Sequence, residues 1–101
     1  MENVGNCRII YTTHVADRMI EREISQDDII TTLKNGIVVD VKINKMSNSC
    51  CLILGKTKRK GYLHVAVEIS DDVIVIITAY RVNAKIKRDD LRKIKETQNE
   101  M

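Results

Sequence analysis

The stretch YLHVAVEISDDVIVIITAY, residues 62–80, decides the fold of this 101-residue chain. Its first half alternates: the odd positions from 63 to 69 are leucine, valine or isoleucine, and the even positions are mixed, as in a half-buried strand. Its second half, residues 73–80, is apolar at nearly every position, which predicts a central strand covered on both faces. The three residues between the halves form a turn, and a connection this short joins antiparallel neighbours.

Two more strands are predicted upstream of this pair. Residues 37–43 are rich in β-branched side chains and residues 50–55 are mostly apolar, and turn-forming clusters at 44–49 and 56–61 separate them from their neighbours. The four segments therefore predict an antiparallel sheet. A short apolar run at 7–11 predicts one further strand near the start of the chain.

The segment between this first strand and residue 36 has helical spacing. Thr12 or Thr13 can cap a first helix over residues 14–22, in which Val15 and Met19 share the face that would be buried. We expect this helix to be short and to end at the polar residues that follow it.

A second helix is predicted by its own capping chemistry. Ser25 can be the N-cap, Asp28 can close a capping box, and Ile24 can pack onto Ile29 outside these polar contacts. Gly36, which follows Asn35, is a good stop because glycine adopts the left-handed backbone conformation without steric cost.

After residue 81 the chain becomes polar and rich in cations, which predicts a basic C-terminal helix at about 84–98. The predicted order is therefore β-α-α-β-β-β-β-α, with an antiparallel sheet and segregated helices, which is the α+β class. Because no proline, repeat or low-complexity stretch marks a linker, we expect a single domain over residues 1–101 with its core in 7–81.

Composition excludes several classes of protein. No apolar run approaches the roughly 20 residues that cross a bilayer, and residues 1–10 lack the features of a signal peptide, so we expect a cytoplasmic protein without membrane contact. Cys7, Cys50 and Cys51 are odd in number and lack paired spacing, which predicts reduced and mostly buried thiols. No phosphate-binding glycine loop, serine elbow or metal-ligand spacing is present, so we expect no cofactor and no metal.

A stripe of three side chains on the first helix has the strongest chemical potential. His14, Arg18 and Arg22 recur every fourth residue and therefore form one line along a helix. Arginine offers a planar fork that matches phosphate oxygens, and histidine can transfer protons near neutral pH. One interpretation is that the stripe recognises a phosphate.

The other interpretation of this stripe is a salt-bridged surface. Asp17 and Glu21 lie close enough along the helix to pair with the arginines, at about 0.2 to 0.5 kcal/mol a pair. An arginine can also be held by Glu68 or by a strand carbonyl. Spacing alone does not separate the two interpretations.

Three residues of the predicted sheet could share a groove with this stripe. His64 lies in mid-strand on the mixed face, and Tyr80 and Arg81 end the last strand. Taken singly, His64 could be a hydrogen-bonded sheet residue, Tyr80 could cap the core and Arg81 could meet solvent. Taken together, they lead us to propose five catalytic residues: His14, Arg18, His64, Arg81 and Tyr80.

A basic turn adds candidate contacts to a substrate. The chain carries a formal charge of +3, and four cations fall within residues 56–60. Such a turn can grip a nucleic-acid backbone, or it can simply be a solvated surface. The predicted substrate-binding residues are Arg22, Lys56, Lys58, Arg59 and Lys60.

Four stretches give the chain a family resemblance: YTTHVADRMIEREIS at 11–25, LILG at 52–55, LHVAVEI at 63–69 and IITAYR at 76–81. On these, the chain resembles a family of small bacterial and archaeal proteins that share a domain of unknown function. The pattern HxxxRxxxR before an isoleucine-serine helix cap is the most specific part. The family is regarded as similar in fold to the RelE and ParE toxins, among the barnase-like and RelE-like ribonucleases.

The resemblance and the candidate residues together predict a metal-independent endoribonuclease of the toxin type, with RNA as substrate and an antitoxin-like protein as partner. One histidine would take the proton of a ribose 2′-hydroxyl, Arg18 and Arg81 would stabilise the phosphorane, and the other histidine or Tyr80 would protonate the leaving oxygen. Two alternatives stay open: a non-catalytic module that binds protein or nucleic acid, and a ParE-like toxin directed at gyrase.

Overall fold

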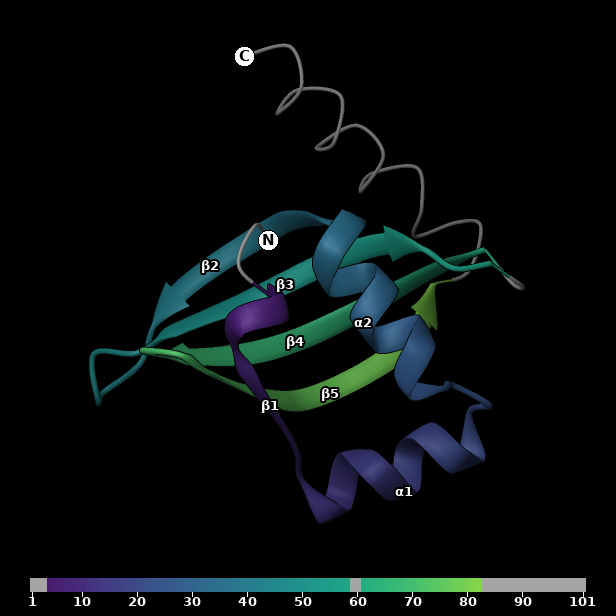
Figure 1. The fold of residues 1–101 in the computed structure, drawn as a ribbon, viewed down its shortest axis with the longest axis horizontal. Helices are drawn as coiled ribbons and strands as arrows, with labels where there is room; N and C mark the ends of the chain where they lie inside the picture. The colour runs from purple at the N-terminus through teal and green to yellow at the C-terminus, as the bar shows by residue number, and fades with distance from the viewer. Residues whose placement is uncertain (1–3, 59–60, 83–101) are drawn as a thin grey trace, which may run out of the picture.

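Five strands form one twisted sheet, and two helices cover one of its faces (Figure 1). The computed structural model describes residues 4–58 and 61–82. The elements follow in the order η1 (Val4–Asn6), β1 (Arg8–Tyr11), α1 (Thr13–Glu21), α2 (Gln26–Asn35), β2 (Ile37–Ile43), β3 (Ser49–Lys56), β4 (Tyr62–Ser70) and β5 (Val73–Val82). The predicted α+β class and the order from the first strand to the last are confirmed. The C-terminal helix predicted at 84–98 lies outside the described residues, as do Arg59 and Lys60.

The sheet order is β1-β5-β4-β3-β2, and its strands are not all antiparallel. β2 to β5 pair antiparallel with one another, as predicted from their short connections. β1 pairs parallel to β5, with Arg8 opposite Val73. The expectation of a wholly antiparallel sheet is therefore wrong at this edge. A short turn dictates direction only for the two strands it joins, and β1 and β5 are joined by most of the chain.

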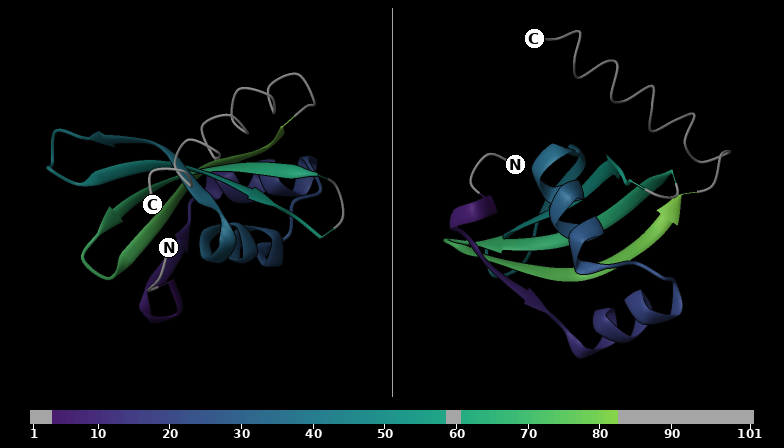
Figure 2. Two further views of the ribbon diagram at one scale, coloured as in Figure 1. Left: turned by 90° about the horizontal axis from the view of Figure 1, so that it is seen from above. Right: turned by 45° about the vertical axis from the view of Figure 1, so that its right-hand side comes forward.

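The core lies between the helices and one face of the sheet, and Figure 2 shows the twist of the sheet with the helices packed on one side of it. Leu63, Val65 and Val67 of β4 join Val15 of α1 and Ile29 of α2 in this core, as the alternation predicted. The even positions of β4 therefore face away from the helices.

β5 is an inner strand of the sheet, but it is not covered on both faces. Ile74, Ile76 and Ala79 are buried in the core, whereas Ile77 is 41% exposed. The register between β4 and β5 shifts between Ala66 and Val67, and Ile77 is left without an opposite residue. This bulge adds an apolar residue on the far face, so the prediction from continuous apolarity is wrong there.

Local capping forms the helix ends as predicted. The Thr12 side chain accepts a hydrogen bond of 3.1 Å from the Val15 N–H at the start of α1. At the start of α2 the Ser25 hydroxyl accepts from the Asp28 N–H at 3.0 Å, and the Asp28 carboxylate accepts from the Ser25 N–H at 3.1 Å. This is the predicted capping box, which satisfies two backbone donors that the helix itself cannot.

Gly36 ends α2 for a different reason from the one predicted. Its backbone is extended, with φ −79° and ψ 174°, and not left-handed. A Cβ atom here would come within 2.4 Å of the Thr32 carbonyl oxygen and 2.8 Å of the Leu54 carbonyl oxygen. Glycine is therefore required by the close approach of α2 to β3.

The three cysteines are free thiols, as expected. Cys51 is buried, whereas Cys7 and Cys50 are half-buried, so the burial prediction holds fully only for Cys51. Burial, and then the neighbouring Cys50, raise the pKa of the Cys51 thiol above its ordinary value. Neither helix of the described residues has the length and apolarity to cross a membrane.

Candidate functional site

The end of α1 is fastened to the sheet by the last arginine of the stripe. Nη1 of Arg22 donates a hydrogen bond of 2.7 Å to the carbonyl oxygen of Ala79 in β5. This is the strand-carbonyl contact that the salt-bridge interpretation allowed for. Because Arg22 is tied to backbone 57 residues away, its guanidinium has a structural role before any ligand arrives.

The chain leaves α1 through a left-handed residue. The Glu23 N–H donates to the Ile20 carbonyl at 3.3 Å, and the Ile24 N–H donates to the Met19 carbonyl at 2.8 Å. Glu23 has φ 55°, a conformation that usually selects glycine. The buried pair of Met19 and Ile24 completes this helix-ending motif.

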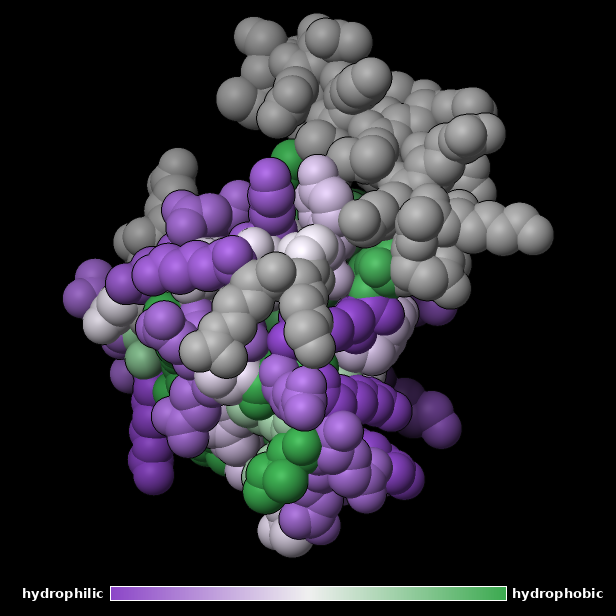
Figure 3. Space-filling view, turned by 90° about the vertical axis from the view of Figure 1, so that its right-hand side faces the viewer, coloured by the Kyte–Doolittle hydropathy of each residue, from purple (hydrophilic) through white to green (hydrophobic). Residues whose placement is uncertain are grey.

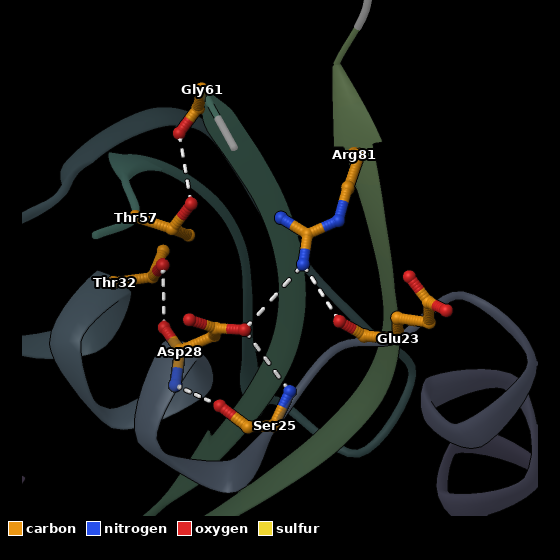
Figure 4. Close-up of polar contacts among 7 residues, drawn as sticks. All are labelled: Glu23, Ser25, Asp28, Thr32, Thr57, Gly61 and Arg81. Atoms are coloured by element: carbon orange, nitrogen blue, oxygen red, sulfur yellow. Dashed lines mark hydrogen bonds and ion pairs between the residues drawn. The ribbon is translucent and has the colours of Figure 1, made fainter. Parts of the chain in front are cut away.

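Arg81 holds both sides of this turn together (Figure 4). Its Nη2 donates a hydrogen bond of 2.7 Å to the Glu23 carbonyl and lies 3.6 Å from a carboxylate oxygen of Asp28. The side chains of Arg81 and Asp28 are 22% and 15% exposed, so this ion pair is largely removed from water. Asp28 therefore serves α2 as a cap and β5 as a counter-ion. We call the set Arg22, Glu23, Ser25, Asp28 and Arg81 the helix junction.

A hollow of about 340 Å³ lies beside the helix junction, and its described lining residues are Glu23, Ser25, Asp27, Asp28 and Lys58. Figure 3 shows the molecule from this end, with a mainly hydrophilic surface and an apolar patch in the region of α1. Among these described lining residues, the carboxylates outnumber the single cation, Lys58. In the part of the chain that the structure describes, no group of three His, Cys, Asp or Glu side chains is arranged to hold a metal ion.

The remaining two residues of the stripe point away from the core. His14 is exposed in the first turn of α1, while its neighbour Val15 is fully buried. Nη1 of Arg18 bonds Glu21 at 2.9 Å, and the Arg18 side chain is 43% exposed. This is the local pairing of the salt-bridge interpretation. We call His14 and Arg18 the α1 surface.

His64 and Tyr80 lie on the opposite face of the sheet from the α1 surface. Leu63 and Val65 on either side of His64 are in the core beneath the helices, so the imidazole faces the other way. Tyr80 is directly opposite His64 in the register of β4 and β5, and their rings meet edge to face with centroids 5.2 Å apart. His64 is only 3% exposed. The five predicted catalytic residues thus divide between the α1 surface, the helix junction and this ring pair.

Glu68 does not hold an arginine of the stripe. Its Oε1 accepts hydrogen bonds from Nδ2 of Asn44 at 2.7 Å and of Asn48 at 2.9 Å, which brace the turn between β2 and β3. The bonds from Asn48 and then Asn44 lower the pKa of the Glu68 carboxyl below its ordinary value. The ionised form therefore supports the fold at neutral pH, and this support is lost as the pH falls through the lowered pKa.

The basic turn is described only in part. Lys56 and Lys58 are both exposed. Thr57 between them is buried and bonds the Gly61 carbonyl through its hydroxyl at 3.0 Å and through its N–H at 2.9 Å. These two bonds join residues on either side of the turn and leave Lys56 and Lys58 exposed.

Sequence reasoning missed the second role of Asp28 and the carbonyl acceptors of Glu23 and Ala79. Asp28 was recognisable as a cap from its spacing to Ser25, but nothing in that spacing signals a contact with Arg81, 53 residues later. A backbone carbonyl has no signal in the sequence, because every residue carries one.

The chain matches a family model described as a domain of unknown function, DUF4258, over residues 11–81. No curated protein and no solved structure matches it. The matched range starts at the end of β1 and ends at Arg81, so it contains both helices, the helix junction and the α1 surface. The chain therefore belongs to the DUF4258 family.

Proposed function

We propose that this protein binds RNA and that the α1 surface is where it holds a backbone phosphate. The observation that carries the proposal is that His14 and Arg18 lie one turn apart on an exposed helix face, while Arg22 and Arg81 are committed to the fold. Side chains at this spacing are neighbours, with Cβ atoms about 5 to 6 Å apart. Together they can approach one phosphate.

The contact between Arg18 and Glu21 leaves Arg18 able to bind. A guanidinium has five N–H donors, and Nη1 makes the one bond to Glu21. Its remaining donors can meet phosphate oxygens in the forked geometry that arginine favours. The His14 imidazole can donate a further hydrogen bond to the same phosphate.

The basic turn supports the same ligand more weakly. Lys56 is exposed at the end of β3, and Lys58 lines the hollow that also contains Glu23, Asp27 and Asp28. Nearby carboxylates offset the attraction of Lys58 for phosphate. Lys56 is therefore the better of the two for a non-specific backbone contact.

A second candidate is cleavage of the bound RNA, as a metal-independent endoribonuclease similar to the RelE-type toxins. Cleavage is favoured by the position of His14, which can transfer a proton, beside Arg18, which can bind a phosphate. His14 would take the proton of a 2′-hydroxyl, the 2′-oxygen would attack phosphorus, and Arg18 would stabilise the phosphorane. The 5′-oxygen would leave with a proton from water, because His64 and Tyr80 are on the other face of the sheet. This missing second acid is why we place binding before cleavage.

The test is titration of fluorescently labelled single-stranded RNA with the protein in EDTA, at several salt concentrations. Arg18→Ala and His14→Ala should each weaken binding roughly fivefold to tenfold, and Arg18→Ala should lower the slope against log salt by about 1. Lys34→Ala, an exposed cation at the end of α2, is the matched control and should change the affinity little.

The same samples, analysed on a denaturing gel, separate the two candidates. Intact RNA would support a binding module. Cleavage that is lost in His14→Ala would support the ribonuclease. Absence of binding, or binding that neither α1 variant changes more than Lys34→Ala does, would overturn the proposal.

A further inference from the structure

β2 is the edge strand of the sheet on the side away from β1 (Figure 1), and it is unusually apolar for an edge. Val41 and Ile43 are 54% and 64% exposed, and Val38 is 38% exposed. Within the described residues no strand pairs with the outer side of β2. An exposed apolar edge is a template for another strand, and proteins normally protect such edges with bulges and charges.

The bulge that protects β2 covers only one end of the strand. A register shift between Val38 and Asp40 makes a bulge against β3. From Asp40 to Ile43 the pairing is regular, with Val41 opposite Cys51 and Lys42 opposite Cys50. This second half of β2 is therefore free of bulges and can accept a strand along its free side.

The charges of this segment are antisymmetric about Val41. Cys51 lies in the core, so Val41 faces the helix side, and Asp40 and Lys42 face the far side, where both line a shallow hollow of about 150 Å³. If a second β2 pairs antiparallel about a two-fold axis at Val41, Asp40 of each copy lies opposite Lys42 of the other. Val41 then meets its own copy, and Ile43 lies beside the bulged Val39.

Neighbouring registers lack this match. An axis at residue 40 places two aspartates opposite each other, and an axis at residue 42 places two lysines opposite each other. Opposite charges in directly paired positions stabilise a sheet, and like charges destabilise it. One register is thus selected, and it is a self-complementary one, as a two-fold interface requires.

We propose that two copies of this chain associate through β2, antiparallel and centred on Val41, so that their sheets join into one. A second copy fits better than an unrelated strand, because antisymmetry about one residue has a consequence only when the strand meets itself. The joined sheet would carry the helices of both copies on the same face, and it would leave both α1 surfaces at a distance from the interface.

The experiment measures the mass of the full chain in solution by sedimentation equilibrium over a concentration series. The wild type should form a dimer. Asp40→Lys and Lys42→Asp each replace two attractive contacts with two repulsive ones, and each should weaken association roughly tenfold to a hundredfold. The double variant Asp40→Lys/Lys42→Asp restores opposite charges in the same register and should recover the dimer.

Asp17→Lys, at an exposed position on α1, is the matched control for net charge and should leave association unchanged. Circular dichroism of each variant checks that the fold is intact. A monomeric wild type, single variants that associate like the wild type, a double variant that stays monomeric, or an Asp17→Lys variant that dissociates as well would each overturn the proposal.

Discussion

The α1 surface and the helix junction contain arginines of one stripe with opposite roles. Arg18 bonds a carboxylate one turn away on its own helix, and an exposed pair of this kind contributes little. Arg22, four residues later, reaches a strand carbonyl, and Arg81 comes back from that strand to the turn that follows α1. Equal spacing in the sequence therefore predicts which residues share a helix face. Their contacts with distant parts of the chain determine which of them stabilise the fold.

Replacing Arg81 should cause the largest loss of unfolding free energy. Arg81→Met keeps most of the side-chain volume but leaves the Glu23 carbonyl and the Asp28 carboxylate without this donor. Loss of both contacts, of which the ion pair with Asp28 is largely removed from water, should cost about 2 kcal/mol of unfolding free energy, or a fall in Tm on the order of 10 °C. Urea denaturation of Arg81→Met and of Arg18→Met measures the contrast. The latter should lose at most about 0.5 kcal/mol, and equal losses would remove the distinction between the two regions.

How far the sequence predicted these regions depends on the separation of the partners. Ser25 and Asp28 are three residues apart, and their capping box was predicted because both ends of it are local. Apolar and mixed positions alternate over residues 62–69, and this local pattern predicted which side chains face the core. The contact of Arg81 with Asp28 spans 53 residues, and the parallel pairing of β1 with β5 joins the first and last strands of the described residues. Neither leaves a local pattern.

The predicted catalytic residues do not share one groove, because they lie on different faces of the sheet. His64 and Tyr80 were correctly placed at their strand positions, but alternation puts His64 on the far side from α1. The bulge at Ile77 also sets which residues of β5 face the helices beyond it, so that Ala79 is in the core and Tyr80 is not. A bulge inserts one residue, and the sequence of residues 73–80, being almost uniformly apolar, does not show where.

Arg22 belongs to both the stripe and the helix junction, and its replacement measures how much it contributes to the fold. Arg22→Met loses the bond to the Ala79 carbonyl, but α1 keeps Val15 and Met19 in the core. The expected loss is about 1 kcal/mol, smaller than for Arg81, because one acceptor is affected instead of two. Combining Arg22→Met with Arg81→Met in a double-mutant cycle tests whether the two act together; coupling above about 0.5 kcal/mol would show that they do.

Glycine should have opposite effects on stability at two nearby positions, Glu23 in the left-handed turn and Glu21 in the helix. Glu23→Gly removes the Cβ from a residue with φ 55° and should stabilise the protein by about 0.5 to 1 kcal/mol. Glu21→Gly, at the last helical position of α1, should destabilise it by a similar amount because glycine weakens a helix. Thermal unfolding of both variants measures this. A loss of stability in Glu23→Gly would mean that the Glu23 side chain contributes more to the junction than its backbone strain costs.

The smallest effect on stability is expected at His14, and it is the most informative for function. His14 is exposed, and Ala is well tolerated in the first turn of a helix, so His14→Ala should change the unfolding free energy by no more than about 0.5 kcal/mol. The same variant should bind RNA roughly fivefold to tenfold more weakly than the wild type, because one of the two side chains that contact the phosphate is gone. An RNA affinity unchanged by the substitution would remove His14 from the phosphate site. A large loss of stability would instead place His14 with the residues that hold the fold, and the α1 surface would no longer differ from the helix junction.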